Sequence, residues 1–227
     1  GYEGDYIVME NGVDVPRGRV SDEAIAAATG RYDLPQNVPV FLFVGRLMWY
    51  KGIRIILDAL KTLREKNVDF RMVFVGEGAD GAEIRSYAEE RKLSDRCFFT
   101  GAISDREIIR AWYGRADLFL FPSTFDTNGL VVREAAASGT ATVMIRNSCA
   151  SEGVGDGRNG FCIEENAAAM AAKLEELCRA PEVMQVVGEN AQRELYVSWE
   201  TAVQRAMARY EVVIDNYHSG KYPKRER

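Results

Sequence analysis

The sequence predicts an α/β fold with a doubly wound parallel sheet of about six strands. Short apolar runs alternate with amphipathic segments along the chain, and this alternation favours right-handed βαβ units. The runs are also mostly apolar on both faces, as buried parallel strands are. We expect strands at residues 40–44, 71–75, 97–100, 118–121, 141–145 and 160–163.

Amphipathic segments between and after these runs are predicted to be helices. The first, 51–66, places a set of apolar residues on one face: Ile53, Ile56, Leu57, Leu60 and Leu63. The others are expected at 81–92, 105–115, 129–138, 166–179, 182–194 and 199–217. Ser104 and Glu107 have the spacing of a capping box, which supports a helix start there.

The composition is that of a soluble globular protein, with 47% hydrophobic and 28% charged residues among 227. The formal net charge of −5 disfavours nucleic acid as the main partner, because phosphate backbones are bound by clustered positive charge. There is no apolar run of about 18 residues, so no membrane span is predicted. The basic tail, residues 221–227, is interpreted as a frayed end, with a lipid-surface contact as the alternative.

The cysteines and the single histidine indicate neither a metal site nor a redox motif. Cys97, Cys149, Cys162 and Cys178 form no C-x-x-C pair, and free thiols are ordinary in a cytoplasmic protein, which we expect this to be. His218 lies near the C-terminus and is expected to be exposed. The first residue is not Met and no signal-peptide pattern follows, so we expect a piece of a longer protein.

The most informative stretch is residues 119–139, FLFPSTFDTNGLVVREAAASG. An apolar strand ends in a Pro-Ser turn, Asp126 follows, and a turn at Asn128-Gly129 leads into a helical segment that carries Glu134. This arrangement puts backbone N–H groups at the carboxyl edge of the sheet, where open α/β folds bind phosphorylated ligands. The two acids suit sugar hydroxyls as acceptors, although either could be a cap or surface residue. No His or further Asp joins them at metal-ligand spacing.

Two cations follow the first predicted strand. Arg46 comes directly after Gly45 at the strand end, and Lys51 precedes Gly52 at the next helix start. Two cations near a helix N-terminus are electrostatically costly unless an anion joins them. A phosphate or diphosphate would balance them, with Arg offering a bidentate fork and Lys a point charge. The alternative is a solvated pair on a loop.

Gly76, Gly78 and Gly81 match the dinucleotide fingerprint G-x-G-x-x-G between a predicted strand and a predicted helix. The match does not follow the first predicted strand, and the acid that would bind the ribose is only loosely placed. A glycine-rich turn that lets a nucleotide approach the backbone explains it better. NAD binding by a Rossmann domain stays an alternative.

These residues together resemble the C-terminal, donor-binding domain of the GT-B fold retaining glycosyltransferases called group 1 or family 4. The resemblance runs nearly the length of the chain, in the elements Asn11-Gly12-Val13-Asp14, Gly45-Arg46 with Lys51-Gly52, Val75-Gly76-Glu77-Gly78, Phe99-Thr100-Gly101, Pro122-Ser123 through Glu134-Ala135, Gly157-Arg158-Asn159-Gly160 and Ser198-Trp199. Any one element is common, whereas the order and spacing of the set are specific. The resemblance implies a Rossmann-like sheet, the C-terminal half of a GT-B fold.

The resemblance also implies roles for individual residues. Arg46 and Lys51 would hold the donor diphosphate, Asp126 would contact hydroxyls of the transferred sugar, and Glu134 would accept hydrogen bonds from the ribose. Backbone N–H groups around Gly129 and Leu130 would bind phosphate oxygens. The remaining donor-binding set implied is Gly45, Glu77, Gly78, Phe99, Thr100, Gly101, Thr127 and Asn128, with the base near residues 77–78 and 98–101.

Two positions depart from the family pattern. Asp126 stands where the family has Glu, and it is one methylene shorter, which can change its reach and the preferred sugar. Residues 149–152, CASE, stand where many members have a glycine-rich turn before a Glu, so the resemblance supports a site role for this loop less strongly than for the others.

The implied activity is retaining transfer of a hexosyl group from a nucleoside-diphosphate sugar, with UDP-sugars favoured, and with no metal or cofactor required. Residues 1–20 would lead into the domain, 21–197 would bind the nucleotide-sugar, and 198–227 would form a C-terminal helix and tail. An N-terminal acceptor domain would complete the enzyme, the isolated chain would be inactive, and the full-length protein could contact a membrane peripherally. A non-catalytic nucleotide-binding domain of the same fold is the other alternative.

Overall fold

A computed structural model of the chain describes residues 9–126 and 129–221. It divides into two compact units. The larger unit is Val15–Tyr196, and the smaller joins the residues before it to those after it, of which 9–14 and 197–221 are described.

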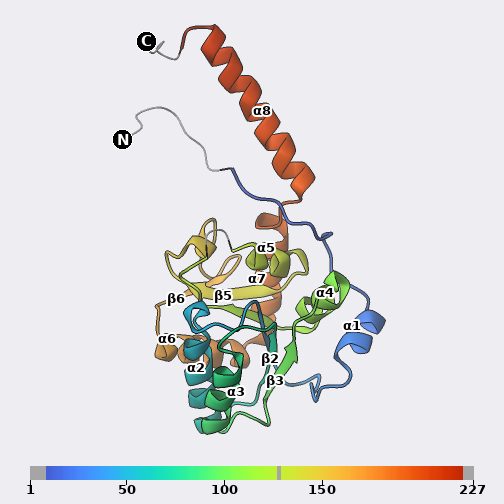
Figure 1. Ribbon diagram of the computed structural model, residues 1–227, viewed down its shortest axis with the longest axis vertical. Coiled ribbons are helices and arrows are strands. Elements are labelled where there is room, and N and C mark those ends of the chain that lie inside the picture. Colours follow the sequence, from blue (N-terminus) through green and yellow to red (C-terminus); the bar gives the residue numbers. More distant parts are fainter. Residues whose placement is uncertain (1–8, 127–128, 222–227) are drawn as a thin grey trace. The chain divides into compact units, whose positions relative to one another are not determined.

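The larger unit is built on one parallel sheet, as the sequence predicts (Figure 1). Its strands are β1 Val40–Val44, β2 Arg71–Val75, β3 Cys97–Gly101, β4 Leu118–Phe121, β5 Ala141–Ile145 and β6 Phe161–Ile163. Their order is β3-β2-β1-β4-β5-β6. The first three strands are therefore added toward one side of the sheet and the last three toward the other, with the switch point between β1 and β4. Crevices at such a switch point are where open α/β sheets bind ligands. The predicted strand bounds are right to within one residue.

The flanking helices fall into two groups. In the first group, α2 Ile53–Glu65 contacts both α3 Gly81–Glu90 and α6 Ala167–Arg179. In the second, α4 Arg106–Arg115 contacts α1 Asp22–Thr29 and α5 Leu130–Ala137. Helix α5 also contacts α7 Pro181–Glu194. Two 3₁₀ turns, η1 Trp49–Lys51 and η2 Cys149–Ser151, complete the unit. The sheet and these helices confirm the Rossmann-like fold.

Three sequence predictions of helices need correction. Helix α1 was not predicted, because its sequence DEAIAAAT has one large apolar residue, Ile25, and so shows no periodicity. The predicted helix 51–66 begins instead as η1, and Gly52 separates it from α2. The N-cap of α4 is Asp105, not Ser104: its carboxylate accepts a hydrogen bond from the Glu107 N–H at 2.8 Å. A carboxylate one residue later therefore replaces the predicted serine cap.

The core confirms the apolar patterns. All five apolar residues predicted on the first helical face, Ile53, Ile56, Leu57, Leu60 and Leu63, are fully buried in α2. Strand β1 is buried along its whole length, and the rings of Phe74 and Phe99 stack at 4.8 Å between centroids. The apolar area removed from water supplies the main driving force for folding, and the strand ends are thereby held at fixed positions.

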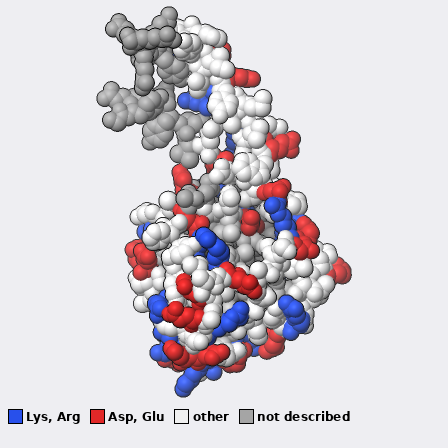
Figure 2. Space-filling view, in the orientation of Figure 1, with Lys and Arg blue, Asp and Glu red and all other residues white. Residues whose placement is uncertain are grey.

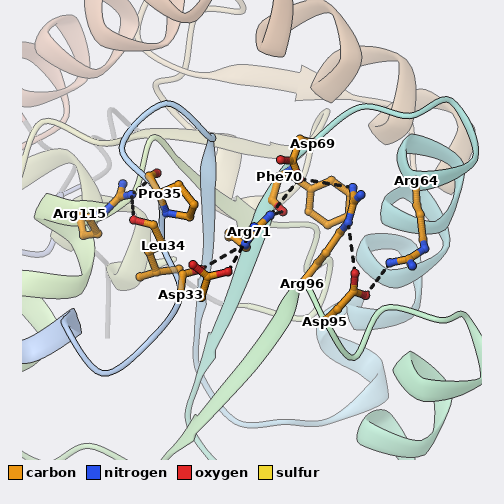
Figure 3. Close-up of polar contacts among 10 residues, drawn as sticks. All are labelled: Asp33, Leu34, Pro35, Arg64, Asp69, Phe70, Arg71, Asp95, Arg96 and Arg115. Atoms are coloured by element: carbon orange, nitrogen blue, oxygen red, sulfur yellow. Dashed lines mark hydrogen bonds and ion pairs between the residues drawn. The ribbon is translucent and has the colours of Figure 1, made fainter.

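A network of arginines closes the amino edge of the sheet (Figure 3). Arg71 at the start of β2 donates to Asp69 Oδ1 at 2.9 Å, and Arg96 donates to the Val68 carbonyl at 2.9 Å. Arg115, just before β4, donates to the carbonyls of Leu34 and Pro35 at 3.1 and 3.0 Å. These guanidinium groups tie the loops that precede the strands to one another.

On the face shown in Figure 2, acidic and basic side chains are interspersed over the surface of the larger unit rather than gathered by sign.

The smaller unit contains helix α8, Trp199–His218. Just before this helix, the Val13 N–H donates a hydrogen bond to the Val197 carbonyl at 2.9 Å. Over the described residues, no helix is long and apolar enough to cross a membrane.

Candidate functional site

The carboxyl ends of β1, β2 and β4 form one level edge. Val44 at the end of β1 pairs with Val75 at the end of β2. Leu42 pairs with Phe119, which brings the ends of β1 and β4 level as well. The loops that follow these three strands carry most of the predicted site residues.

Glycines let these loops pack backbone against backbone. A Cβ added to Gly76 would lie 2.0 Å from the Gly45 carbonyl oxygen, and one added to Gly78 would lie 2.3 Å from the Leu47 oxygen. Hydrogen bonds from Gly45 N–H to the Val75 carbonyl, 3.0 Å, and from Gly76 N–H to the Gly101 carbonyl, 2.9 Å, join the strand ends. Close packing of these loops thus requires Gly76 and Gly78, the first two glycines of the pattern that resembles a dinucleotide fingerprint, whereas a Cβ on Gly81 would meet only ordinary contacts.

Lys51 is the best-fixed cation of the site. It ends η1, and Gly52 then adopts a left-handed conformation, φ 77°, that ends η1 and caps α2. A Cβ on Gly52 would lie 2.1 Å from the Pro122 carbonyl oxygen, so only glycine fits there. The first N–H of η1, on Trp49, donates to Asp80 Oδ2 at 2.8 Å. These contacts hold Lys51 at the junction of the loops that follow β1 and β4.

Lys51 and Asp126 meet, although they are 75 positions apart in the sequence. Lys51 Nζ donates to Asp126 Oδ2 at 2.6 Å, and the two side chains are only 13% and 23% exposed. The structure therefore brings together the predicted diphosphate lysine and the predicted sugar-contacting acid. The Asp126 carboxylate thus lies directly against the Lys51 ammonium group.

Arg46 lies beside them and has a weaker partner. Its guanidinium donates to the Tyr50 hydroxyl at 2.8 Å, and its side chain is exposed. Across residues 9–126 and 129–221, the structure pairs Arg46 with no carboxylate. It can therefore accept an incoming anion without first losing an ion pair.

The start of α5 faces the same edge. Its N-cap, Gly129, has φ 59° and offers no side chain to accept from the first helical N–H groups. Leu130 is 39% exposed. An open helix N-terminus carries partial positive charge and directs N–H donors outward. Thr127 and Asn128, also predicted to bind the donor, lie outside the described residues.

Glu134 follows Leu130 by one turn, on the same face of α5. Burial raises the pKa of its carboxyl above the ordinary value, while a hydrogen bond from the Tyr113 hydroxyl, 3.4 Å from Oε2, and the charge of Arg106 act in the opposite direction. Burial also raises the pKa of Tyr113 well above its ordinary value, with the Glu134 charge as the second cause. Glu134 is a constrained acceptor rather than a solvated helix residue.

The predicted base-binding residues lie at the ends of β2 and β3. Glu77 and Gly78 are exposed, and a Cβ on Gly101 would come within 3.3 Å of Glu77 Oε1. Thr100 Oγ1 donates to the Gly101 carbonyl at 2.9 Å. Phe99 is occupied by protein contacts, since its ring stacks on Phe74 and has the Arg85 guanidinium 4.5 Å from its centroid.

Sequence reasoning missed several residues that shape the site. Asp80 orients the η1 turn, and Tyr113 orients Glu134. Each comes from a different element than the group it orients. Tyr50 holds Arg46, and its ring contacts Phe125 at 6.0 Å between centroids. Ala150 of η2 packs on Gly129, so the loop 149–152, which departs from the family pattern, lies beside the start of α5. Tyr50 and Phe125 could have been found from the sequence, because they directly precede Lys51 and Asp126. No sequence pattern pointed to Asp80, Tyr113 or Ala150.

Residues 27–194, most of the larger unit, match the family described as glycosyl transferases group 1. The chain belongs to this family. A D-inositol 3-phosphate glycosyltransferase of Streptomyces avermitilis is 29% identical over 88% of this chain and 45% of its own length. A glycogen synthase of Mycobacterium tuberculosis is 29% identical over 86% of this chain and 45% of its own length. The chain thus spans about half the length of the curated relatives it matches.

Solved structures confirm the fold of this group 1 member. A glycosyltransferase of Rickettsia africae superposes with a TM-score of 0.77 at 22% identity, over 92% of this chain and 57% of that one. The C-terminal domain of a group 1 family protein of Francisella tularensis superposes with a TM-score of 0.65 at 21% identity, over 82% of this chain and 94% of that one. An Anabaena protein in complex with UDP-glucose gives 0.74 at 22% identity, over 86% and 54%. The predicted GT-B half, with its Rossmann-like sheet, is confirmed.

Proposed function

We propose that this chain is the donor-binding domain of a glycosyltransferase and binds a nucleoside-diphosphate sugar, with UDP-sugars favoured, for retaining transfer of a hexosyl group. Family membership supports the transferase class, and the Anabaena protein of the same fold was crystallised with UDP-glucose. The observation that carries the proposal is the Lys51–Asp126 pair at 2.6 Å, next to the uncapped start of α5.

The chemistry of this edge suits a sugar diphosphate. Cleavage of the sugar–phosphate bond builds negative charge on the departing diphosphate and positive charge on the anomeric carbon. Prealigned cations and N–H dipoles lower the barrier by stabilising the leaving group. Arg46, Lys51 and the N–H groups at Leu130 supply them, and no metal or cofactor is needed for that step in this proposal.

The two acids divide the remaining contacts. Asp126 accepts hydrogen bonds from hydroxyls of the transferred sugar once the diphosphate has drawn Lys51 away from it. Glu134 accepts hydrogen bonds from the ribose hydroxyls in its ionised form. The base lies against Glu77, Gly78 and Gly101, at the ends of the strands on the other side of β1.

Transfer itself requires a second domain in this proposal. The acceptor groups belong to an N-terminal domain of the same polypeptide, for which the relatives have room because each is about twice as long as the matched part. The isolated chain binds nucleotide but transfers no sugar. Peripheral membrane contact and a cytoplasmic location also belong to the proposal for the full-length protein.

Calorimetric titration of UDP, GDP, ADP and NAD into the wild-type chain and into Lys51→Ala tests this function. We expect one nucleoside diphosphate to bind the wild type and to lose at least tenfold in affinity in the variant, about 1.4 kcal/mol. NAD binding in preference to every nucleoside diphosphate, or diphosphate binding that is indifferent to Lys51, would contradict the proposal.

A further inference from the structure

Phe125 is an apolar side chain that the fold leaves in solvent. It is 76% exposed, the largest fraction among the large hydrophobic residues that the structure describes. A single exposed apolar residue needs no explanation by itself. Phe125, however, lies directly before Asp126 in the loop after β4, beside the ion pair of the proposed donor site.

Tyr50 holds this ring in place from a second loop. The two rings meet edge to face, with centroids 6.0 Å apart and planes at 72°. The Tyr50 hydroxyl accepts a hydrogen bond from Arg46 at 2.8 Å, and the Lys51 ammonium lies 5.4 Å from the Tyr50 ring. Tyr50 thus contacts Arg46, Lys51 and Phe125, and its ring is the aromatic neighbour of Phe125 at this edge.

The strand order gives the site a direction. The proposed base contacts lie at the ends of β2 and β3, the diphosphate lysine follows β1, and Phe125 follows β4. Since neighbouring strands are about 4.8 Å apart, β3 and β4 are separated by about 14 Å. A nucleoside diphosphate bound from β3 toward β4 directs its sugar end to the side where Phe125 and Asp126 lie.

An aromatic face beside a carboxylate is suited to a pyranose ring. The rim of the sugar carries hydroxyl donors, which a carboxylate accepts. One or both of its faces carry C–H groups with slight positive charge, which pack on the negative face of an aromatic ring. Neither a phosphate nor a metal ion offers both surfaces.

We propose that Phe125, held by Tyr50, packs against the C–H face of the donor sugar while Asp126 accepts hydrogen bonds from its hydroxyls. This inference rests on the proposed function and adds a specificity determinant to it. The aromatic pair contributes to the affinity for the sugar and not to the affinity for the nucleotide.

The test measures the sugar increment, the ratio of the Kd of a nucleoside diphosphate to the Kd of its sugar conjugate. UDP with UDP-glucose and UDP-galactose, and GDP with GDP-mannose, are titrated into the wild type, Phe125→Ala, Phe125→Tyr and Tyr50→Ala. Tyr210→Ala, which removes a 58% exposed ring from α8, is the matched control. Because Phe125 is so exposed, its variants should keep the wild-type melting temperature, which is measured alongside.

We expect Phe125→Ala to reduce the sugar increment at least threefold while the Kd of the diphosphate changes less than twofold. Phe125→Tyr and Tyr210→Ala should keep the wild-type increment, and Tyr50→Ala should lose part of it. An equal loss for diphosphate and conjugate, an unchanged increment in Phe125→Ala, or a wild type that shows no increment with any conjugate would overturn the inference alone. A wild type that binds no nucleoside diphosphate would overturn the proposed function, and this inference with it.

Discussion

The two edges of the sheet use the same kinds of charged residue in opposite ways. At the amino edge, Arg71 and Arg115 are 13% and 16% exposed and are bound to carboxylates and backbone carbonyls of neighbouring loops. At the carboxyl edge, Lys51 is just as buried but has one carboxylate, and Arg46 has a tyrosine hydroxyl. A cation whose acceptors all come from the fold is structural, whereas one whose acceptor a ligand can replace is available for binding.

The backbone differs between the edges as well. Long arginine side chains join the loops of the amino edge (Figure 3). At the carboxyl edge the loops also approach backbone to backbone, Gly76 against Gly45 and Gly52 against Pro122. Close backbone packing leaves little freedom for the loops, and the N–H groups of Gly45 and Gly76 donate to backbone carbonyls within it.

The largest expected effect breaks this backbone contact. Gly52→Ala places a Cβ 2.1 Å from the Pro122 oxygen at φ 77°. Left-handed strain of about 1–2 kcal/mol and overpacking of about 1–3 kcal/mol together lower the free energy of unfolding by about 2–5 kcal/mol. Urea unfolding measures it.

Gly157→Ala is the matched control for the glycine at position 52. It has the same left-handed conformation, φ 73°, with no atom within 4 Å of its added Cβ. It should lose only the conformational part, about 1–2 kcal/mol. Equal losses in the two variants would mean that the contact with Pro122 adds nothing.

An intermediate effect concerns the ionisation of Glu134. Because burial raises the pKa of this carboxyl, the folded chain holds the proton more tightly than the unfolded chain does. Stability therefore falls as the pH rises from the unfolded pKa through the raised folded pKa. Glu134→Gln should be more stable than the wild type at neutral pH, and this advantage should shrink as the pH is lowered. Thermal unfolding across pH measures both.

Nucleotide binding should show the reverse dependence. Ribose hydroxyls need the ionised acceptor, so wild-type affinity for the nucleoside diphosphate should fall as the pH drops through the raised pKa of Glu134. In Glu134→Gln the affinity should be lower at neutral pH, by about tenfold for one lost charge-assisted hydrogen bond. The affinity of Glu134→Gln should also decrease less with falling pH than the wild-type affinity does. A variant that binds like the wild type at every pH would remove Glu134 from the site.

The smallest expected effect is a gain in ligand affinity on removal of a charged side chain. It tests whether a diphosphate replaces Asp126 as the hydrogen-bond acceptor of Lys51. Asp126→Asn removes the carboxylate that competes with a diphosphate for the ammonium group. The Lys51 ammonium group is then fully available to the diphosphate, so we expect UDP to bind roughly threefold more tightly, about 0.6 kcal/mol. Isothermal titration measures it.

Asp69→Asn is the corresponding change at the amino edge, where the acid accepts from Arg71. It should leave UDP affinity unchanged, since no ligand replaces this acceptor. Weaker UDP binding in Asp126→Asn would show that Asp126 positions Lys51 rather than competing for it.

Sequence reasoning predicted the fold better than the contacts within the site. The strands were predicted closely because each contains a short apolar run, and β1, β4, β5 and β6 are buried along their whole length. The positions of Lys51 and Asp126 at strand ends followed from the same pattern. Their ion pair did not, since it depends on how the loops after β1 and β4 pack. Burial of Glu134 under Tyr113 depends on the contact between α4 and α5, which no local pattern specifies.

The contact between Gly52 and Pro122 has a consequence for protein engineering. The segment 46–52 and the segment from Pro122 to Asp126 meet at the backbone contact between Gly52 and Pro122 and at the Lys51–Asp126 ion pair, so a substitution in one constrains the other. Attempts to change the donor by grafting one of these loops from a relative would bring a surface matched to a different neighbour. The two segments form a single cassette, and they should be exchanged together.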